Sequence, residues 1–147
     1  MTRFEIVNPE ALGRPSGFSH GILAPPGARI LFVAGQSAPD AGHDEADRTG
    51  AEGVLVEQFT AALARVLAVV SDAGGRPEHV ARLTVYVTDM EAYRGARARL
   101  GDAWRAAMGR HYPAMALVEV GSLVDLGAVV EIEATAALPP GPVGTAE

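Results

Sequence analysis

Residues 52–87 read EGVLVEQFTAALARVLAVVSDAGGRPEHVARLTVYV, and in this stretch a helix pattern passes directly into a strand pattern. Apolar side chains recur at the spacing of one buried helix face: Leu55, Phe59, Leu63, Val66 and Val70. This spacing predicts a helix from about residue 52 to residue 73, ended by the glycines at 74 and 75. Residues 80–87 then alternate imperfectly between apolar and polar side chains, which predicts a strand with one buried face.

Three β-prone runs precede this stretch, at residues 4–7, 18–23 and 30–34. The second and third flank a turn-forming segment rich in proline and glycine, so we expect them to pair as a hairpin. The third run continues as ILFVAGQ, and its unbroken apolar character predicts a central strand. Residues 37–50 are polar and contain glycine, which is typical of a surface loop.

A second helix and two more strands follow. Thr88 and Glu91 have the spacing of a capping box, and an apolar stripe then continues to Met108. Residues 115–120 and 128–136 are β-prone. The resulting order of strand, strand, strand, helix, strand, helix, strand, strand favours an α+β domain with a mixed sheet and two helices on one face.

The length of 147 residues fits one domain, which we expect to cover residues 1–138, followed by a flexible tail at residues 139–147. Two helices cover only one face of the predicted sheet. The other face therefore has to be buried against another subunit, which predicts a homo-oligomer.

Composition excludes several classes of function. Without cysteine or lysine the chain has no thiol nucleophile, cysteine metal site, Schiff-base lysine or phosphate-binding lysine. Its formal net charge of −6 argues against nucleic acid as a partner. No continuous apolar run reaches the roughly 20 residues of a membrane span, and the first residues do not resemble a signal peptide. We therefore expect a cytoplasmic protein with no membrane partner.

Candidate chemistry is sparse. The four histidines are scattered, so no metal site is predicted, and the glycines at 13, 17 and 21 are interpreted as turn residues, not as a dinucleotide-binding motif. Glu119, Glu131 and Glu133 interrupt apolar β runs, and a carboxylate on a buried face must be paired or change its pKa. Alternation places Glu131 and Glu133 on one face. A purely structural role for these glutamates is also possible: they could lie on a solvent-facing side of a strand or form an ion pair with arginine between subunits.

Five segments in order resemble the RidA (YjgF) family, also called L-PSP endoribonuclease-like, over residues 8–138: LFVAGQ (31–36), EQFTAALARVLAVVSDAGG (57–75), VARLTVYVTDMEAY (80–93), YPAMALVEVGSL (112–123) and VVEIEATAAL (129–138). The resemblance implies a bacterial type of protein with the fold of the chorismate mutase of bacilli. It also implies a homotrimer with a central barrel and ligand clefts between subunits. Deaminases of this family hydrolyse enamines and imines without a cofactor, with an arginine that binds the substrate carboxylate and a glutamate that positions water.

The resemblance transfers these roles onto this chain only in part. The glutamate matches Glu131, but Met115 stands where the family has its arginine, and methionine offers neither charge nor donor. Phe18 replaces the common tyrosine of the cleft, and His20 replaces a glutamine. Arg97 stands where deaminases often carry asparagine. It could bind the substrate carboxylate in place of the missing arginine.

We therefore expect a trimer that binds or hydrolyses an unidentified small molecule in its intersubunit cleft and does not deaminate 2-imino acids. The alternative is a noncatalytic module for ligand binding or protein interaction. A third possibility is an enamine or imine deaminase in which Arg97 binds the substrate carboxylate. RNA cleavage, suggested by the family's older name, is disfavoured by the acidic balance of the chain.

Overall fold

The structure is a computed structural model that describes residues 3–42 and 50–141 of the chain. Its elements, in chain order, are β1 (Glu5–Val7), the 3-10 helix η1 (Glu10–Leu12), β2 (Gly21–Leu23), β3 (Arg29–Gln36), α1 (Gly50–Asp72), the 3-10 helix η3 (Pro77–His79), β4 (Val80–Val87), α2 (Met90–Gly95), α3 (Arg97–Met108), β5 (Ala114–Glu119) and β6 (Val130–Leu138). The predicted α+β class, mixed sheet and element order are confirmed. The predicted number of helices is wrong, because the second helix is divided into α2 and α3.

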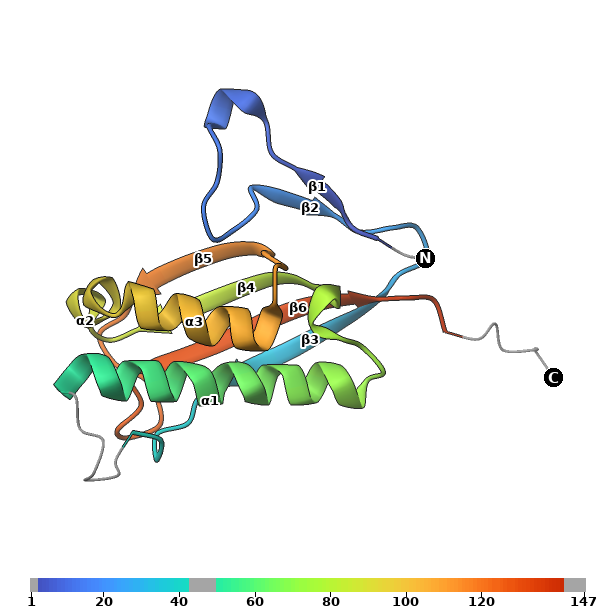
Figure 1. The fold of residues 1–147 in the computed structure, drawn as a ribbon. Helices are drawn as coiled ribbons and strands as arrows, with labels where there is room; N and C mark the ends of the chain where they lie inside the picture. Colours follow the sequence, from blue (N-terminus) through green and yellow to red (C-terminus); the bar gives the residue numbers. More distant parts are fainter. Residues whose placement is uncertain (1–2, 43–49, 142–147) are drawn as a thin grey trace.

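Four strands form one mixed sheet in the order β3-β6-β4-β5 (Figure 1). β6 runs antiparallel to β3 and β4, and β4 runs parallel to β5. The prediction that ILFVAGQ is central is wrong, because β3 is an edge strand in which Phe32 is 79% exposed. A continuous apolar run indicates that both faces of a strand are apolar, but it does not show that one chain covers both of them.

The predicted hairpin between residues 18–23 and 30–34 is also wrong. β2 pairs with β1, with Ile22 opposite Ile6, in a separate two-stranded sheet that projects from the body (Figure 1). The expected turn exists, since Ala28 N–H donates to Pro25 O over 3.3 Å. It leads the chain away from β2 and into the larger sheet, which turn chemistry alone does not reveal.

The first predicted helix is confirmed as α1. Its end is closed by Gly74, with a φ of 84°, and by Gly75, whose N–H donates to Val70 O over 2.8 Å. This is the hydrogen-bond pattern of a helix that ends on a left-handed glycine.

The second predicted helix is interrupted at Ala96, which lies between α2 and α3 with φ −92° and ψ 5°. The predicted capping box is wrong as well. Asp89 caps α2 by accepting a hydrogen bond from Ala92 N–H over 3.0 Å, whereas Thr88 N–H donates to Val129 O. Thr88 follows the end of β4 and bonds to the backbone just before β6, and α2 begins beyond it, with Asp89 as its cap.

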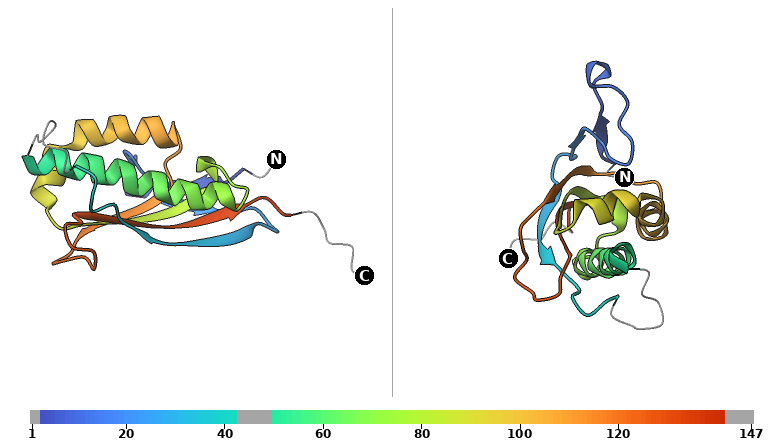
Figure 2. Two further views of the ribbon diagram at one scale, coloured as in Figure 1. Left: turned by 90° about the horizontal axis from the view of Figure 1, so that it is seen from below. Right: turned by 90° about the vertical axis from the view of Figure 1, so that its left-hand side faces the viewer.

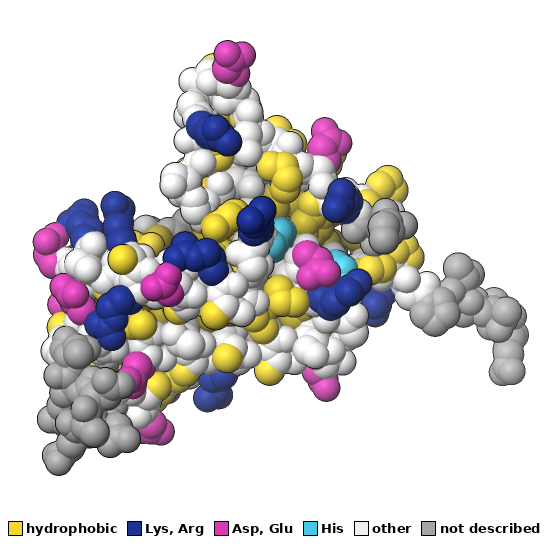
Figure 3. Space-filling model, in the orientation of Figure 1, with side chains coloured by type: hydrophobic (Ala, Val, Ile, Leu, Met, Phe, Trp, Pro, Cys, Tyr) yellow, Lys and Arg dark blue, Asp and Glu magenta, His cyan; other side chains and the backbone are white. Residues whose placement is uncertain are grey.

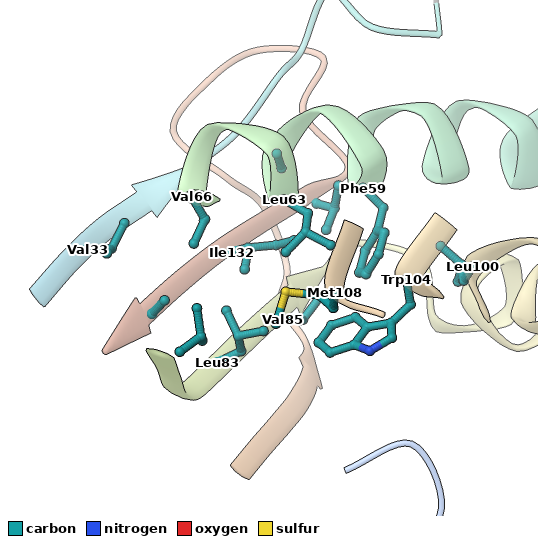
Figure 4. Packing of buried hydrophobic residues seen from close by; sticks show 14 of the residues in the cluster. Val33, Phe59, Leu63, Val66, Leu83, Val85, Leu100, Trp104, Met108 and Ile132 are labelled. Carbon is teal, nitrogen blue, oxygen red and sulfur yellow. The ribbon is translucent and has the colours of Figure 1, made fainter. Parts of the chain in front are cut away.

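α1 and α3 cover one face of the sheet and leave the other face without a helix (Figure 2). Between the layers, Leu63 and Val66 of α1 point towards Ile132 of β6 (Figure 4), and all three side chains are at most 1% exposed. Trp104 and Met108 bring α3 into the same cluster. Burial of each aliphatic side chain contributes about 1.5–3 kcal/mol, so this cluster is the main source of stability.

The buried side chain of Gln58 helps to join the loops at one end of the core. Gln58 of α1 is fully buried, and its Nε2 donates to Pro39 O over 3.3 Å and to Gly127 O over 3.0 Å. Its Oε1 accepts from Val129 N–H over 2.9 Å. Because all these groups are bonded, the amide is buried without an unsatisfied donor or acceptor.

By length and composition alone α1 could cross a membrane, since its most apolar window has a mean hydropathy of 1.7. Its apolar side chains pack on β6 and β3, which is the position of a core helix. Residues 43–49 of the expected surface loop and residues 142–147 of the expected tail lie outside the described residues. Residues 37–42 and 139–141 contain neither helix nor strand.

Candidate functional site

Glu131 lies on β6 and belongs to the sheet face that no helix covers. It is paired with Tyr86 of β4 and is partly exposed, whereas the next residue, Ile132, is fully buried under α1. This alternation is the one expected from the sequence. We call this uncovered surface the open face, and it contains Phe32, Thr84, Tyr86, Val118, Glu131, Glu133 and Thr135.

The carboxylate of Glu131 lies against the backbone of β3 at Gly35. A Cβ atom on Gly35 would be 2.6 Å from Oε1 and 2.8 Å from Cδ of Glu131. The register between β3 and β6 also shifts between Val33 and Gln36, as at a β-bulge. The glycine and the irregular strand together leave room for the carboxylate at the edge of the sheet.

Glu133 lies on the same open face, two residues farther along β6. Its Oε1 accepts a hydrogen bond from the Tyr86 hydroxyl over 2.8 Å. This bond, and then burial, raise the pKa of Tyr86, because ionisation would remove the donated proton and place a phenolate beside a carboxylate. Glu133 is therefore engaged with a neighbouring strand of its own chain.

Glu119, the third glutamate that the sequence singled out, has a structural partner. Its Oε1 accepts from Met90 N–H over 2.9 Å, at the first residue of α2. A carboxylate at a helix N-terminus satisfies a free N–H and stabilises the helix dipole. Its position explains Glu119 without a ligand.

Met115 faces the opposite side of the sheet from Glu131. On β5 it is paired with Leu83 of β4, whose side chain is fully buried, and it packs against the hydrophobic core. Its neighbour Ala116 is paired with Thr84 on the open face. Within one chain, Met115 and Glu131 therefore do not meet.

Phe18 and His20 lie together along the outer edge of β5. Their rings make an edge-to-face contact with centroids 5.3 Å apart. Between them, Ser19 bridges to Ala114, and its hydroxyl donates to Tyr112 O over 2.6 Å. The segment from Phe18 to His20 is thus held beside Ala114, the residue that directly precedes Met115.

His20 already has partners in this position. Its backbone N–H donates to Asn8 Oδ1 over 2.8 Å, and its ring Nε2 lies 3.2 Å from Gly13 O, which accepts the hydrogen bond. These bonds hold the segment between η1 and β2. Gly13 and Gly17 have φ values of 75° and 78°, so their interpretation as turn residues is confirmed. The same interpretation is wrong for Gly21, which is the first residue of β2 and pairs with Val7.

Arg97 is exposed at the first residue of α3. It is close enough to Tyr93 to offset part of a pKa shift: burial raises the pKa of the Tyr93 hydroxyl, and the Arg97 charge lowers it. A guanidinium that stabilises a phenolate at the helix surface is an ordinary surface charge. Nothing in this geometry directs Arg97 to Met115.

The five predicted site residues therefore form separate groups. The structure brings Phe18 and His20 to the edge that carries Met115, and leaves Glu131 on the open face and Arg97 on α3. Sequence reasoning missed Gly35 and Tyr86, the two neighbours of the candidate glutamates. Glycine in an apolar strand is a known sign of close approach, but strand register was needed to name its partner.

A metal or cofactor site was not expected. Within residues 3–42 and 50–141, no three His, Asp or Glu side chains are grouped so that they could hold a metal ion. Of the four histidines, His43 lies outside these residues.

The fold and the open face define a class: a small α+β domain whose mixed sheet is covered by helices on one side only. A family model described as Endoribonuclease L-PSP matches residues 9–138, and the chain belongs to this family. It is 30% identical over 135 residues to a RutC family protein of Pyrococcus horikoshii, covering 90% of this chain and 96% of the relative.

Solved structures agree with this assignment. A protein of the conserved Rid family from Yersinia pestis is similar with a TM-score of 0.70 and 30% identity, covering 92% of this chain and 99% of that one. A member of the YjgF/YER057c/UK114 family from Mycobacterium tuberculosis is similar with a TM-score of 0.58 and 27% identity, over the same shares. The resemblance seen in the sequence is thereby confirmed. Family membership supports a small-molecule-binding or hydrolytic role.

Proposed function

We propose that the chain forms a homotrimer with a chorismate-mutase-like central barrel made by its open faces. The support is the apolar surface exposed there: Phe32 is 79% exposed, Ile30 on the same strand 51%, and Val118 on β5 41%. A face of this kind is stabilised when a second copy covers it. The assembly belongs in the cytoplasm and needs neither membrane nor nucleic acid.

The ligand site of this trimer lies between subunits. The observation that carries the proposal is the opposite orientation of Met115 and Glu131 on one sheet. A cleft that contains both has to combine the β5 edge of one subunit with the open face or β3 edge of the next. Phe18 and His20, beside Met115, belong to the first of these surfaces, and Glu131 and Gly35 belong to the second.

In this cleft Glu131 orients a water molecule towards an electrophilic carbon, such as the carbon of an imine. A carboxylate can accept a proton from the attacking water, and the partial exposure of Glu131 leaves it accessible. Met115 removes the bidentate guanidinium that would hold a substrate carboxylate. The substrate class is therefore a small imine-like molecule without a carboxylate beside the reacting carbon.

The test is hydrolysis of imines, with and without a 2-carboxylate. Glu131→Gln should lower turnover of a carboxylate-free imine by about a hundredfold or more, as loss of a general base does. Glu133→Gln is the matched control, because it changes the same residue type on the same strand and face. Equal losses in both variants, or wild-type turnover of 2-imino acids at the rate of an arginine-bearing relative, would refute the proposal.

Met115→Arg tests the substrate class from the other direction. The variant restores the family's arginine, so it should gain hydrolysis of 2-imino acids that the wild-type chain lacks. No gain, in a variant that remains folded by circular dichroism, would mean that Met115 does not determine the substrate class.

A noncatalytic binding module is the second candidate. It is favoured by the hydrogen bond between the His20 ring and Gly13 O, since this bond leaves the histidine a structural role. This candidate predicts binding without turnover in the wild type and in Glu131→Gln. The name of the family model describes an endoribonuclease, but the net charge of −6 disfavours an RNA substrate.

A further inference from the structure

A cavity of about 1010 Å³ lies where the start of β1, the end of β6 and η3 meet. Phe4, just before β1, and Ile6 of β1 form one apolar wall, and Pro139 and Pro140 form another. None of the five residues expected in the intersubunit cleft lines this cavity. Figure 3 shows histidine side chains on this face of the molecule, with arginine, acidic and hydrophobic side chains close around them.

The walls of the cavity are held in place by the rest of the fold. The His111 ring donates from Nε2 to Val80 O over 2.6 Å, and its backbone carbonyl accepts from Trp104 Nε1 over 3.2 Å. The Phe4 ring packs on His111 with centroids 6.1 Å apart. Such a preformed pocket loses little entropy when a ligand binds.

His79 presents a hydrogen-bond donor to the cavity. Its Nδ1 accepts from Arg76 N–H over 2.9 Å, so in the neutral ring the proton is on Nε2. This nitrogen has no hydrogen-bond partner among the residues that the structure describes. The residue is 9% exposed, and it lines the cavity with its remaining accessible surface. An imidazole N–H that faces the cavity without a hydrogen-bond partner is available to an acceptor supplied by a ligand.

Two guanidinium groups, those of Arg3 and Arg76, add positive charge at the same place. Glu78 pairs with Nε of Arg76 over 3.3 Å, which leaves the terminal nitrogens of this guanidinium without a partner within the described part of the chain. Two cations and one anion give the rim a local excess of positive charge. The chain as a whole has a formal net charge of −6, so the local charge of the rim is opposite in sign to the charge of the chain.

We propose that this cavity binds a small molecule with one anionic group, a carboxylate or a phosphate, attached to an apolar body. The anion is held by Arg76, Arg3 and the Nε2–H of His79, whose donors match its oxygens. The apolar body packs against Phe4, Ile6 and the two prolines. This site is separate from the proposed cleft, and it does not depend on the function proposed there.

The first measurement is a titration of the full chain followed by NMR of the His79 and His111 rings. Phenyl phosphate and benzoate are the two anionic probes, and benzyl alcohol is the neutral probe of similar shape. We expect saturable shifts of both ring signals with at least one anion, and much weaker binding of the alcohol. The better anion identifies the head group. Absence of saturation with both anions, or equal affinity for the alcohol, would overturn the proposal.

The second measurement compares Arg76→Gln with Arg105→Gln. Both arginines are exposed and form one ion pair, Arg76 with Glu78 and Arg105 with Asp102, but Arg105 lies on α3 and does not line the cavity. Arg76→Gln should raise the Kd of the bound anion about tenfold or more, and Arg105→Gln should leave it unchanged. An equal rise of the Kd in both variants would mean that only the net charge of the protein matters, which contradicts a specific binding site in this cavity.

Discussion

The carboxylate of Glu131 occupies the space where a side chain of Gly35 would begin, with Oε1 only 2.6 Å from the position of the missing Cβ. Gly35→Ala should therefore displace Glu131. The atoms in the way are the flexible end of a side chain, so the free energy of unfolding should fall by about 1 kcal/mol or less. Turnover or ligand affinity should fall much more. Melting temperature and activity, measured on the same sample, separate the two effects.

Gly121→Ala is the matched control, because nothing lies within 4 Å of a Cβ at that position. It should change neither measurement. If Gly35→Ala keeps full activity, the position of the Glu131 carboxylate is not important for function.

The Tyr86–Glu133 hydrogen bond gives a prediction about pH. Because the pKa of Tyr86 is raised above its ordinary value of 10.0, the bond contributes its full stabilisation below pH 10 and loses it as pH rises through the higher folded-state value. Glu133→Gln removes the carboxylate, so the pKa of Tyr86 should fall. Alkaline titration of tyrosine absorbance should show this, with Tyr86→Phe identifying the signal among the three tyrosines. An unchanged titration curve in Glu133→Gln would contradict the assignment.

Gly75, just after α1, and Gly101, inside α3, should respond to alanine with opposite signs. At Gly75 a Cβ would lie 2.8 Å from Val70 Cγ1 and 3.1 Å from Val70 O, so Gly75→Ala should lower the free energy of unfolding by about 1–3 kcal/mol. At Gly101, inside α3, the nearest atom is Arg105 Nη1 at 3.4 Å, and alanine should add about 0.5–1 kcal/mol. Urea denaturation of both variants measures the difference, and a shift of the same sign in both would be inconsistent with this packing.

The proposed trimer can be tested at Phe32, the most exposed aromatic side chain of the open face. Phe32→Glu would place a charge in the buried interface, so light scattering should show the mass of one chain in place of three. Val69→Glu changes an apolar residue in the helix layer, where Val69 is 36% exposed, and should leave the wild-type mass unchanged. A single-chain mass for the wild-type protein would refute the trimer directly.

Periodicity and breakers were sufficient to predict α1, β4 and the chain order, because each of these depends on local pattern. β4 occupies the predicted residues 80–87. The pairing of β2 with β1 and the edge position of β3 could not be read in this way, since two apolar strands beside one turn have no sequence mark of partner choice. The break at Ala96 was missed for a different reason: Gly95, directly before it, weakens a helix, but the apolar stripe continues across both residues.

The candidate site was predictable in residue type and not in geometry. Alternation placed Glu131 and Glu133 on one face correctly. It could not show that Tyr86 lies beside Glu133 or that Gly35 lies beside Glu131. Both contacts depend on the register of strands whose residues are 47 and 96 positions apart in the sequence. The orientation of Met115 towards the core follows from its pairing with Leu83, and that parallel pairing joins strands separated by two helices.

The buried amide of Gln58 has a consequence for changes in loop length in this chain. One side chain bonds Pro39, Gly127 and Val129, which belong to connections 19 to 71 residues away in sequence. An insertion or deletion that moves any of these backbone groups leaves part of the amide without a partner in an apolar environment. Gln58 therefore fixes points in two loops at once, and a change in loop length is tolerated where it leaves Pro39, Gly127 and Val129 in place.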